Sequence, residues 1–231
     1  MGRSIYGTFC IAGVLVVCVG SETLWAQPET QALTVLAFNY SRASDSLVTQ
    51  AEKETSRVFS DSGIKLSWID CAAHSQLDSP PMCTSEAAPA QIRLRILDRN
   101  AGKLYQGDIF GFATAPVFAS VYYESALRLA ATSTDSELNV SILLGCLIAH
   151  EIGHLLLGPN RHAASGIMRA SWDTNQVKLA MMGSLLFMRE QSKLMLKNVQ
   201  LRINVNRASN VPTEQNISPR GTIIQQTATK R

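Results

Sequence analysis

The side chains in this sequence best suited to chemistry are three polar residues set in an apolar stretch. His150, Glu151 and His154 lie in the segment His-Glu-Ile-Gly-His, within residues 141–157, which are otherwise almost wholly apolar. In a helix, residues four positions apart lie about 40° apart on one face. Both imidazoles can therefore reach one cation of zinc size, and Glu151 beside them can take a proton from a water bound to that cation.

The surroundings of this motif favour a metal site over an ordinary buried helix. Burying two imidazoles and a carboxylate among apolar residues is costly unless a metal ion compensates. Gly158 follows where the helix must end, and His162 comes four residues later, so three of the four histidines in the chain fall within 13 residues. Residues 165–168 then read Ser-Gly-Ile-Met, which supplies a glycine for a tight turn and a methionine at its end.

This arrangement resembles the metzincin clan of zinc peptidases. Their signature is a His-Glu-x-x-His helix, a glycine, a third histidine and a downstream turn that carries a methionine beneath the metal. The resemblance implies three zinc ligands: His150, His154 and His162. It also implies that Glu151 is the general base, that Gly158 turns the chain and that Met168 is the methionine of the turn.

The spacing departs from the usual metzincin pattern. In that pattern the glycine follows the second histidine by three residues and the third histidine follows by three more, whereas both gaps are four here. We expect a helix that is one residue longer and a wider loop that returns His162 to the metal. No tyrosine follows Met168 to act as the transition-state donor that some relatives have, and the nearby Trp172 is not equivalent to it.

Each residue of the motif also has a simpler interpretation. His150 and His154 are alternatively hydrogen-bonded core histidines, His162 a surface loop residue, and Met168 an ordinary core methionine. If His162 is not a ligand, the best substitute is Glu190 on the last predicted helix, since some zinc enzymes use two histidines and one glutamate.

The rest of the chain supplies elements that can position this site. Alternating patterns predict strands at 33–38, 64–69, 91–97 and 117–123, with an edge strand at 110–114. Helices are expected at 45–60, 136–157 and from 174 to about 198. This order predicts one α+β domain. The resemblance implies a mixed twisted sheet with two long helices in an upper subdomain, and a smaller, mainly helical lower subdomain.

Three cysteines lie beyond the N-terminal apolar segment. Cys71 and Cys83 are expected to form a disulfide that holds the proline-rich loop between them, and Cys146 is expected to pack as a small buried hydrophobe. The alternative is a metal site formed by the two loop cysteines and His74, a spacing that matches no familiar zinc pattern.

The N-terminus has the layout of a secretory signal peptide, with Arg3 before an apolar run at 11–19 and cleavage expected after Ala26. An uncleaved anchor is the alternative, but this run is short of the roughly 20 residues that a span needs. We therefore expect a secreted or periplasmic protein with no membrane span in its mature chain. The catalytic domain is predicted at 27–205 and a flexible polar tail at 206–231.

The composition is that of a globular protein, with 46% hydrophobic and 17% charged residues. A net charge of +3, with no basic block interleaved with aromatics, argues against nucleic-acid binding. The predicted function is that of a zinc-dependent endopeptidase acting on a peptide or protein. The alternatives are a zinc hydrolase of non-peptide amides or esters, and a non-catalytic exported zinc-binding protein. The sequence does not specify the oligomeric state.

Overall fold

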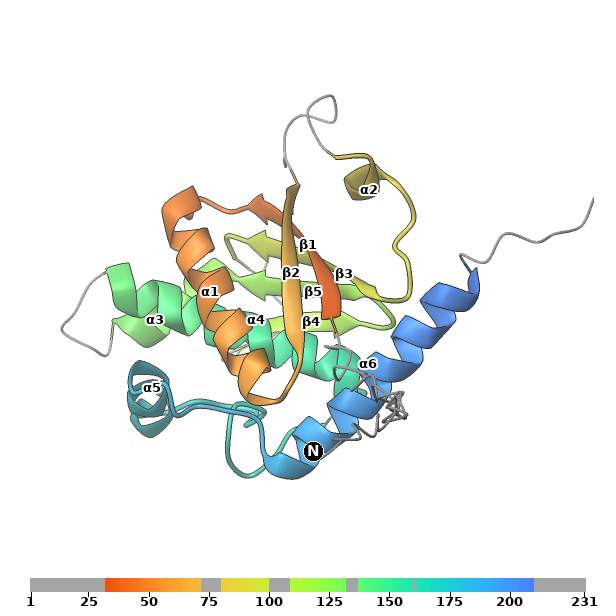
Figure 1. Cartoon of the computed structure of the whole chain (residues 1–231). Coiled ribbons are helices and arrows are strands. Elements are labelled where there is room, and N and C mark those ends of the chain that lie inside the picture. Colours follow the sequence, from red (N-terminus) through yellow and green to blue (C-terminus); the bar gives the residue numbers. More distant parts are fainter. Residues whose placement is uncertain (1–31, 72–79, 100–108, 132–136, 160, 210–231) are drawn as a thin grey trace, which may run out of the picture.

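The structure is a computed structural model that describes residues 32–71, 80–99, 109–131, 137–159 and 161–209 (Figure 1). The predicted signal peptide at 1–26 and residues 210–231 of the predicted tail lie outside these ranges. Within the described part, a mostly parallel sheet and six helices form a mixed α and β fold, as the element order predicts.

The sheet has five strands in the order β2-β1-β3-β5-β4. Four of them are parallel to one another: β1 (Ala32–Tyr40), β2 (Lys65–Cys71), β3 (Gln91–Leu97) and β5 (Phe118–Tyr122). The short strand β4 (Gly111–Thr114) runs antiparallel to β5 at one end of this order. All five predicted strands, including the edge strand, are therefore confirmed.

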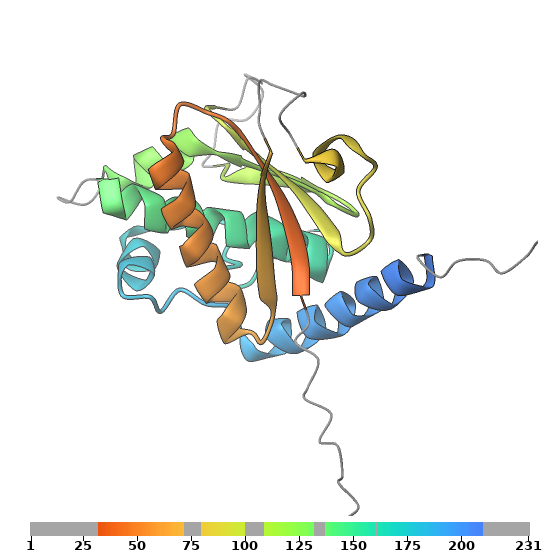
Figure 2. The same cartoon turned by 45° about the horizontal axis from the view of Figure 1, so that its top comes forward.

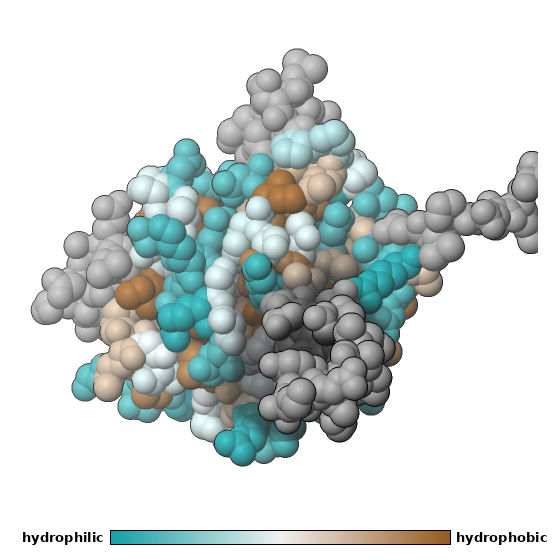
Figure 3. Space-filling model, in the orientation of Figure 1, coloured by the Kyte–Doolittle hydropathy of each residue, from teal (hydrophilic) through white to brown (hydrophobic). Residues whose placement is uncertain are grey.

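Three helices pack around the core. They are α1 (Asp45–Asp61), α3 (Tyr123–Ala130) and α4 (Glu137–Leu157). The Ser44 side chain caps α1 by accepting a hydrogen bond from the amide of Leu47, which matches the predicted start. Figure 1 and Figure 2 show α4 crossing behind the strands in both views. Figure 3 shows that the face carrying α1 and β2 is mostly hydrophilic, with small apolar patches, as expected for a helix that buries only one face.

Helix α4 is the central core element. Its segment Val140–Leu157 is long and apolar enough to cross a membrane, but 89% of that segment is buried inside the domain. The helix packs closely against α1 at Gly145. A Cβ atom added to this glycine would come within 2.6 Å of the Ala51 carbonyl oxygen. The predicted helix at 136–157 is confirmed, and the apolar character of residues 141–157 is explained by this burial.

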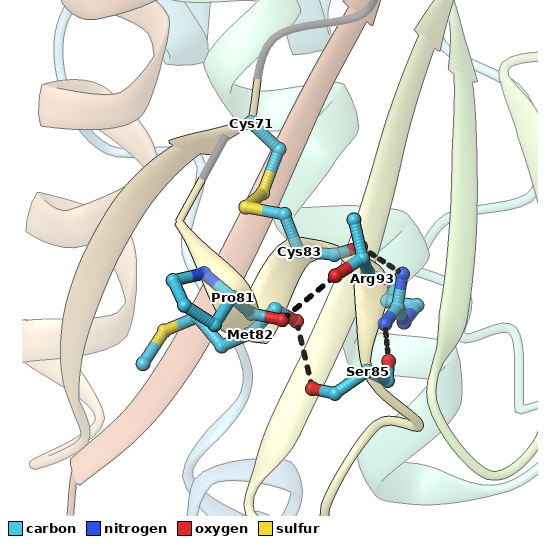
Figure 4. Close-up of a disulfide and its surroundings, with 7 residues drawn as sticks. Cys71, Pro81, Met82, Cys83, Ser85 and Arg93 are labelled. Atoms are coloured by element: carbon cyan, nitrogen blue, oxygen red, sulfur yellow. Dashed lines mark hydrogen bonds between the residues drawn. A yellow bond between two sulfur atoms is a disulfide. The ribbon is translucent and has the colours of Figure 1, made fainter. Parts of the chain in front are cut away.

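The disulfide fastens a loop over the sheet on the side away from α4 (Figure 4). Cys71 at the end of β2 is bonded to Cys83 in the short helix α2 (Pro81–Thr84), as predicted. Arg93 on β3 donates hydrogen bonds to the carbonyl oxygens of Cys83 and Ser85. The alternative metal site is excluded, because both cysteines are consumed in the disulfide; His74 itself lies outside the described residues. Cys146 is free and buried.

The predicted C-terminal helix is wrong in its continuity and its end. It divides into α5 (Thr174–Met181) and α6 (Arg189–Ser209). Gly183 between them has φ +67°, a left-handed conformation that ends α5. The linking segment then buries Phe187, whose ring lies 5.2 Å from that of Phe59 on α1. Helix α6 also extends through residues 206–209, so the predicted flexible tail does not begin at residue 206.

Candidate metal centre

Three histidines converge at the C-terminal end of α4. His150 and His154 project from the helix, and His162 returns from the following loop, so that one nitrogen of each lies within 4.8 Å of the others. The Nε2 atoms of His150 and His154 are 3.1 Å apart. Two nitrogens bound to one tetrahedral zinc at about 2.05 Å would be roughly 3.3 Å apart. The cluster therefore has the size needed to hold one metal ion.

The loop that returns His162 begins at Gly158. This glycine has φ +101°, and its amide donates a hydrogen bond to the carbonyl oxygen of His154 in the last turn of α4. The helix ends at Leu157, so the stretched spacing is accommodated as expected: α4 continues past His154 and a wider loop follows. His150 is buried, His154 is half-buried and His162 is exposed, which places the cluster at the wall of a cleft.

His150 is oriented from below by the backbone. Its Nδ1 lies 2.7 Å from the carbonyl oxygen of Ile167, and a carbonyl can only accept, so Nδ1 carries the proton. Nε2 is then left with a free lone pair directed at the cluster. Two aromatic rings flank the imidazole: that of Phe110 at 5.5 Å and that of Trp172 at 6.2 Å between ring centres.

The turn at residues 165–168 lies directly beneath the turn of α4 that carries His150 and His154. Met168 is fully buried, and a Cβ atom added to Gly153 would meet its Sδ at 2.7 Å. The Met168 carbonyl accepts a hydrogen bond from the amide of Ala163, one residue after His162, which ties the ligand loop to this turn. The glycine inside the His-Glu-Ile-Gly-His motif is thus required by close packing.

The two buried imidazoles are neutral in the folded protein. Burial lowers the pKa of His150 to about 3. Burial, followed by the charge of His162, lowers the pKa of His154 to about 4. Neutral imidazoles are the form that binds transition metals. A cation between the rings would accept the lone pairs of Nε2 of both histidines, and three imidazole nitrogens are a donor set that fits zinc.

Glu151 lies beside the cluster and beneath β4. It is 4% exposed, and a Cβ atom added to Gly111 would lie 3.0 Å from its Cγ. Burial raises the pKa of this carboxyl to about 8. Glu151 and the histidines line a cleft of about 360 Å³. The other lining residues are Ile109, Phe110, Gly111, Phe112, Ala113, Ala115, Leu155, Gly158, Pro159 and Ala170.

The backbone of β4 forms the upper rim of this cleft. The Tyr122 amide donates a hydrogen bond to the Phe110 carbonyl. Along an antiparallel pair of strands, every second residue pair is hydrogen-bonded in this way. The next hydrogen-bonded pair is therefore Phe112 with Ser120, so the amide and carbonyl of Phe112 point to β5. The amides and carbonyls of Gly111 and Ala113 therefore point away from β5, toward the free edge. The cleft thus carries a row of backbone donors and acceptors above Glu151.

Glu190, the predicted substitute ligand, is not part of the cluster. It is exposed in the first turn of α6, and the metal-binding group found among the described residues contains only the three histidines. Two contacts of His150 are not predicted by the sequence: that with the Ile167 carbonyl and that with the ring of Phe110. The only signal for the former was the tight turn at residues 165–168, and nothing local marks the latter.

Comparison with known proteins bears on the fold. No family model and no curated protein matches the chain. An archaemetzincin from Methanopyrus kandleri is similar at 19% identity and a TM-score of 0.45, covering 75% of this chain and 98% of that one. A zinc-dependent peptidase from Methanocorpusculum labreanum is similar at 15% identity and a TM-score of 0.50, covering 70% and 99%. The second likeness shows that this chain has the fold of that zinc-dependent peptidase.

Proposed function

We propose that this protein is an exported zinc endopeptidase of the metzincin type. The observation that carries the proposal is the convergence of three histidines beside a buried glutamate, within a cleft rimmed by a free strand edge. In the proposed site His150, His154 and His162 hold the zinc. When bound, zinc supplies an activated water and polarises the carbonyl of the scissile bond.

Glu151 is the proposed proton carrier. Its carboxylate takes the proton from the attacking water and passes it to the departing amine. A nearby dication favours the ionised carboxylate and so opposes the effect of burial on its pKa. The Ile167 carbonyl keeps His150 in the tautomer that presents Nε2 to the metal.

An extended peptide is the substrate that best fits the rim of the cleft. The outward amides and carbonyls of Gly111 and Ala113 can pair with a peptide backbone by strand addition. That pairing would lay the peptide over Glu151, which passes beneath Gly111. A small amide or ester would leave these backbone groups unused, and this argues against a non-peptide hydrolase.

A non-catalytic zinc-binding protein is the remaining alternative. A purely structural zinc site normally has four protein ligands, whereas the cluster among the described residues offers three. A structural site also has no use for a buried carboxylate such as Glu151. We therefore favour the catalytic function.

The organisation proposed for the whole chain follows the sequence. Residues 1–26 form a signal peptide, and the catalytic domain begins at residue 27 and ends with α6 at Ser209 rather than at residue 205. It has an upper subdomain built on the sheet and a lower one after α4. The mature protein is secreted or periplasmic.

The proposal is tested first by elemental analysis of protein purified without chelators. We expect about one zinc per chain in the wild type and in Glu190→Ala, and a large loss in His162→Ala. The wild type should also cleave peptides from a random library. Wild-type protein without zinc would contradict the proposal, and zinc without cleavage of any peptide would favour the binding protein.

A further inference from the structure

The sheet face turned away from α1 and α4 carries only positive charges from its strands. Side chains alternate between the two faces of a strand, and Val35, Leu94 and Val121 point to the core face. The opposite face carries three cations and a group of aromatic rings but no acidic residue from any of the five strands. Its cations are Lys65, Arg93 and Arg95, and its aromatic residues are Phe38, Tyr40, Phe112, Phe118 and Tyr122.

Arg95 is held in place at the end of this face nearest the cleft. Its Nε donates to the hydroxyl oxygen of Ser120, 3.1 Å away, and its guanidinium lies 5.8 Å from the centre of the Phe112 ring. Ser120 is fully buried and Phe112 is 41% exposed. The ion pairs formed by the described residues do not include Arg95, so its charge has no carboxylate partner there.

Phe112 connects this face to the proposed active site, because it also lines the cleft that contains Glu151. A peptide added to β4 would lie about 4.8 Å from that strand and would turn alternate side chains toward the outer face. One such side chain would lie beside the Phe112 ring, within reach of the guanidinium that Arg95 extends over Ser120.

We propose that Arg95 and Phe112 form a subsite that selects an acidic residue in the peptide substrate. This inference rests on the proposed peptidase function. Arg93 is unsuited to the same role, because it already donates to two carbonyls of the disulfide loop. The guanidinium of Arg95, fixed by Ser120 and stacked near an aromatic ring, binds a carboxylate with less loss of side-chain entropy than a mobile lysine would.

The experiment profiles the cleavage of a peptide library by the zinc-loaded protein and then compares matched Glu, Gln and Lys peptides. For wild type we expect about fivefold higher kcat/KM with Glu than with Gln at one position. Arg95→Gln should abolish this ratio, and Arg95→Glu should invert it in favour of Lys. Lys65→Gln is the control, because it removes the same charge from the same face at the far edge of the sheet.

A binding measurement separates failure of the subsite from failure of the peptidase function. The zinc-loaded Glu151→Gln protein is titrated into labelled peptides of alternating Val and Glu, or Val and Gln. Tighter binding of the Glu peptide that depends on Arg95 but not on Lys65, with no peptide cleaved, would overturn the proposed function and keep the subsite. Cleavage without an Arg95-dependent preference in either measurement would overturn the subsite alone. Neither cleavage nor preference would overturn both.

Discussion

Two glutamates are buried in the helices of this core, and their surroundings are opposite in character. Glu52 on α1 is 7% exposed and Glu151 on α4 is 4% exposed. Burial is the main cause that raises the pKa of each to about 8. Asp70 on β2 adds to the shift of Glu52, whereas Glu151 lies beside three histidines and opens on a cleft.

The comparison shows that a raised carboxyl pKa does not by itself identify a functional site. Glu52 has the carboxylate of Asp70 as its neighbour and does not line the cleft, so its burial only costs stability. Glu151 has potential metal ligands beside it and a free strand edge above it, so its carboxylate lies where the proposed function needs a proton acceptor. The neighbouring groups distinguish the two sites.

The largest expected effect comes from removing each carboxylate in turn. We expect Glu151→Gln to lower the rate of peptide cleavage roughly 10³-fold, because a general base contributes an effect of about this size. Zinc content should stay at the wild-type level, since Glu151 is not a ligand. Glu52→Gln is the matched control and should retain cleavage. Equal losses in the two variants would show that the loss reflects the fold rather than the site.

Two glycines of α4 differ in what surrounds them: Gly145, which packs against the backbone next to Glu52, and Gly153, two residues after Glu151. A Cβ atom at Gly145 would meet the α1 backbone at Ala51, whereas one at Gly153 would meet the flexible Met168 side chain at 2.7 Å and the Phe187 ring at 2.8 Å. We expect Gly145→Ala to lower the free energy of unfolding by about 2 kcal/mol with little change in zinc affinity. Gly153→Ala should destabilise less but weaken zinc binding about tenfold by displacing the turn that orients His150.

Thermal unfolding of the zinc-free proteins and competition with a chelator measure the two effects separately. The distinction between a structural and a functional end of α4 would fail if Gly145→Ala weakened zinc binding more than Gly153→Ala did.

The parts of the fold that were predictable have strong local signals. Helix α1 has a serine cap and an apolar stripe, β3 alternates strictly, and the apolar run of α4 carries its own metal-binding motif. The disulfide followed from the few cysteines available. The histidine cluster was predictable because two of its members share one helical face and the third follows a turn-forming glycine.

The parts that were not predictable depend on contacts between distant segments. The break after α5 is decided by the burial of Leu185 and Phe187 against the core, which overrides a helical pattern that runs through Gly183. Phe110 flanks His150 only because β4 lies over α4, and the two residues are 40 positions apart in the sequence. Neither contact leaves a trace in local sequence periodicity.

The pH dependence of stability tests whether burial of Glu52 destabilises the folded protein. Its pKa is about 8 in the folded protein and 4.5 ordinarily, so between these values the folded state holds a proton that the unfolded chain has lost. Stability due to this group is therefore fully present below pH 4.5 and falls as pH rises toward 8. Glu52→Gln should remove this fall, so that its gain over wild type grows from about 2 kcal/mol at pH 6 to about 4 kcal/mol at pH 8.

The measurement is the midpoint of urea unfolding of both proteins across that range. Asp70→Asn serves as a second variant, because removing the neighbouring carboxylate should lessen the fall without abolishing it. A constant difference between wild type and Glu52→Gln at all pH values would contradict the assignment.

The smallest expected effect concerns the strand above Glu151. Ala113→Pro removes an amide that points to the free edge, so it should reduce peptide cleavage about tenfold while zinc content and unfolding temperature stay the same. Phe112→Pro removes an amide that bonds to β5 and should lower the unfolding temperature as well. If Ala113→Pro left cleavage unchanged, the peptide would not pair with β4. Glu151 would then keep its neighbouring histidines, but its cleft would lack the bound peptide strand that sets its surroundings apart from those of Glu52.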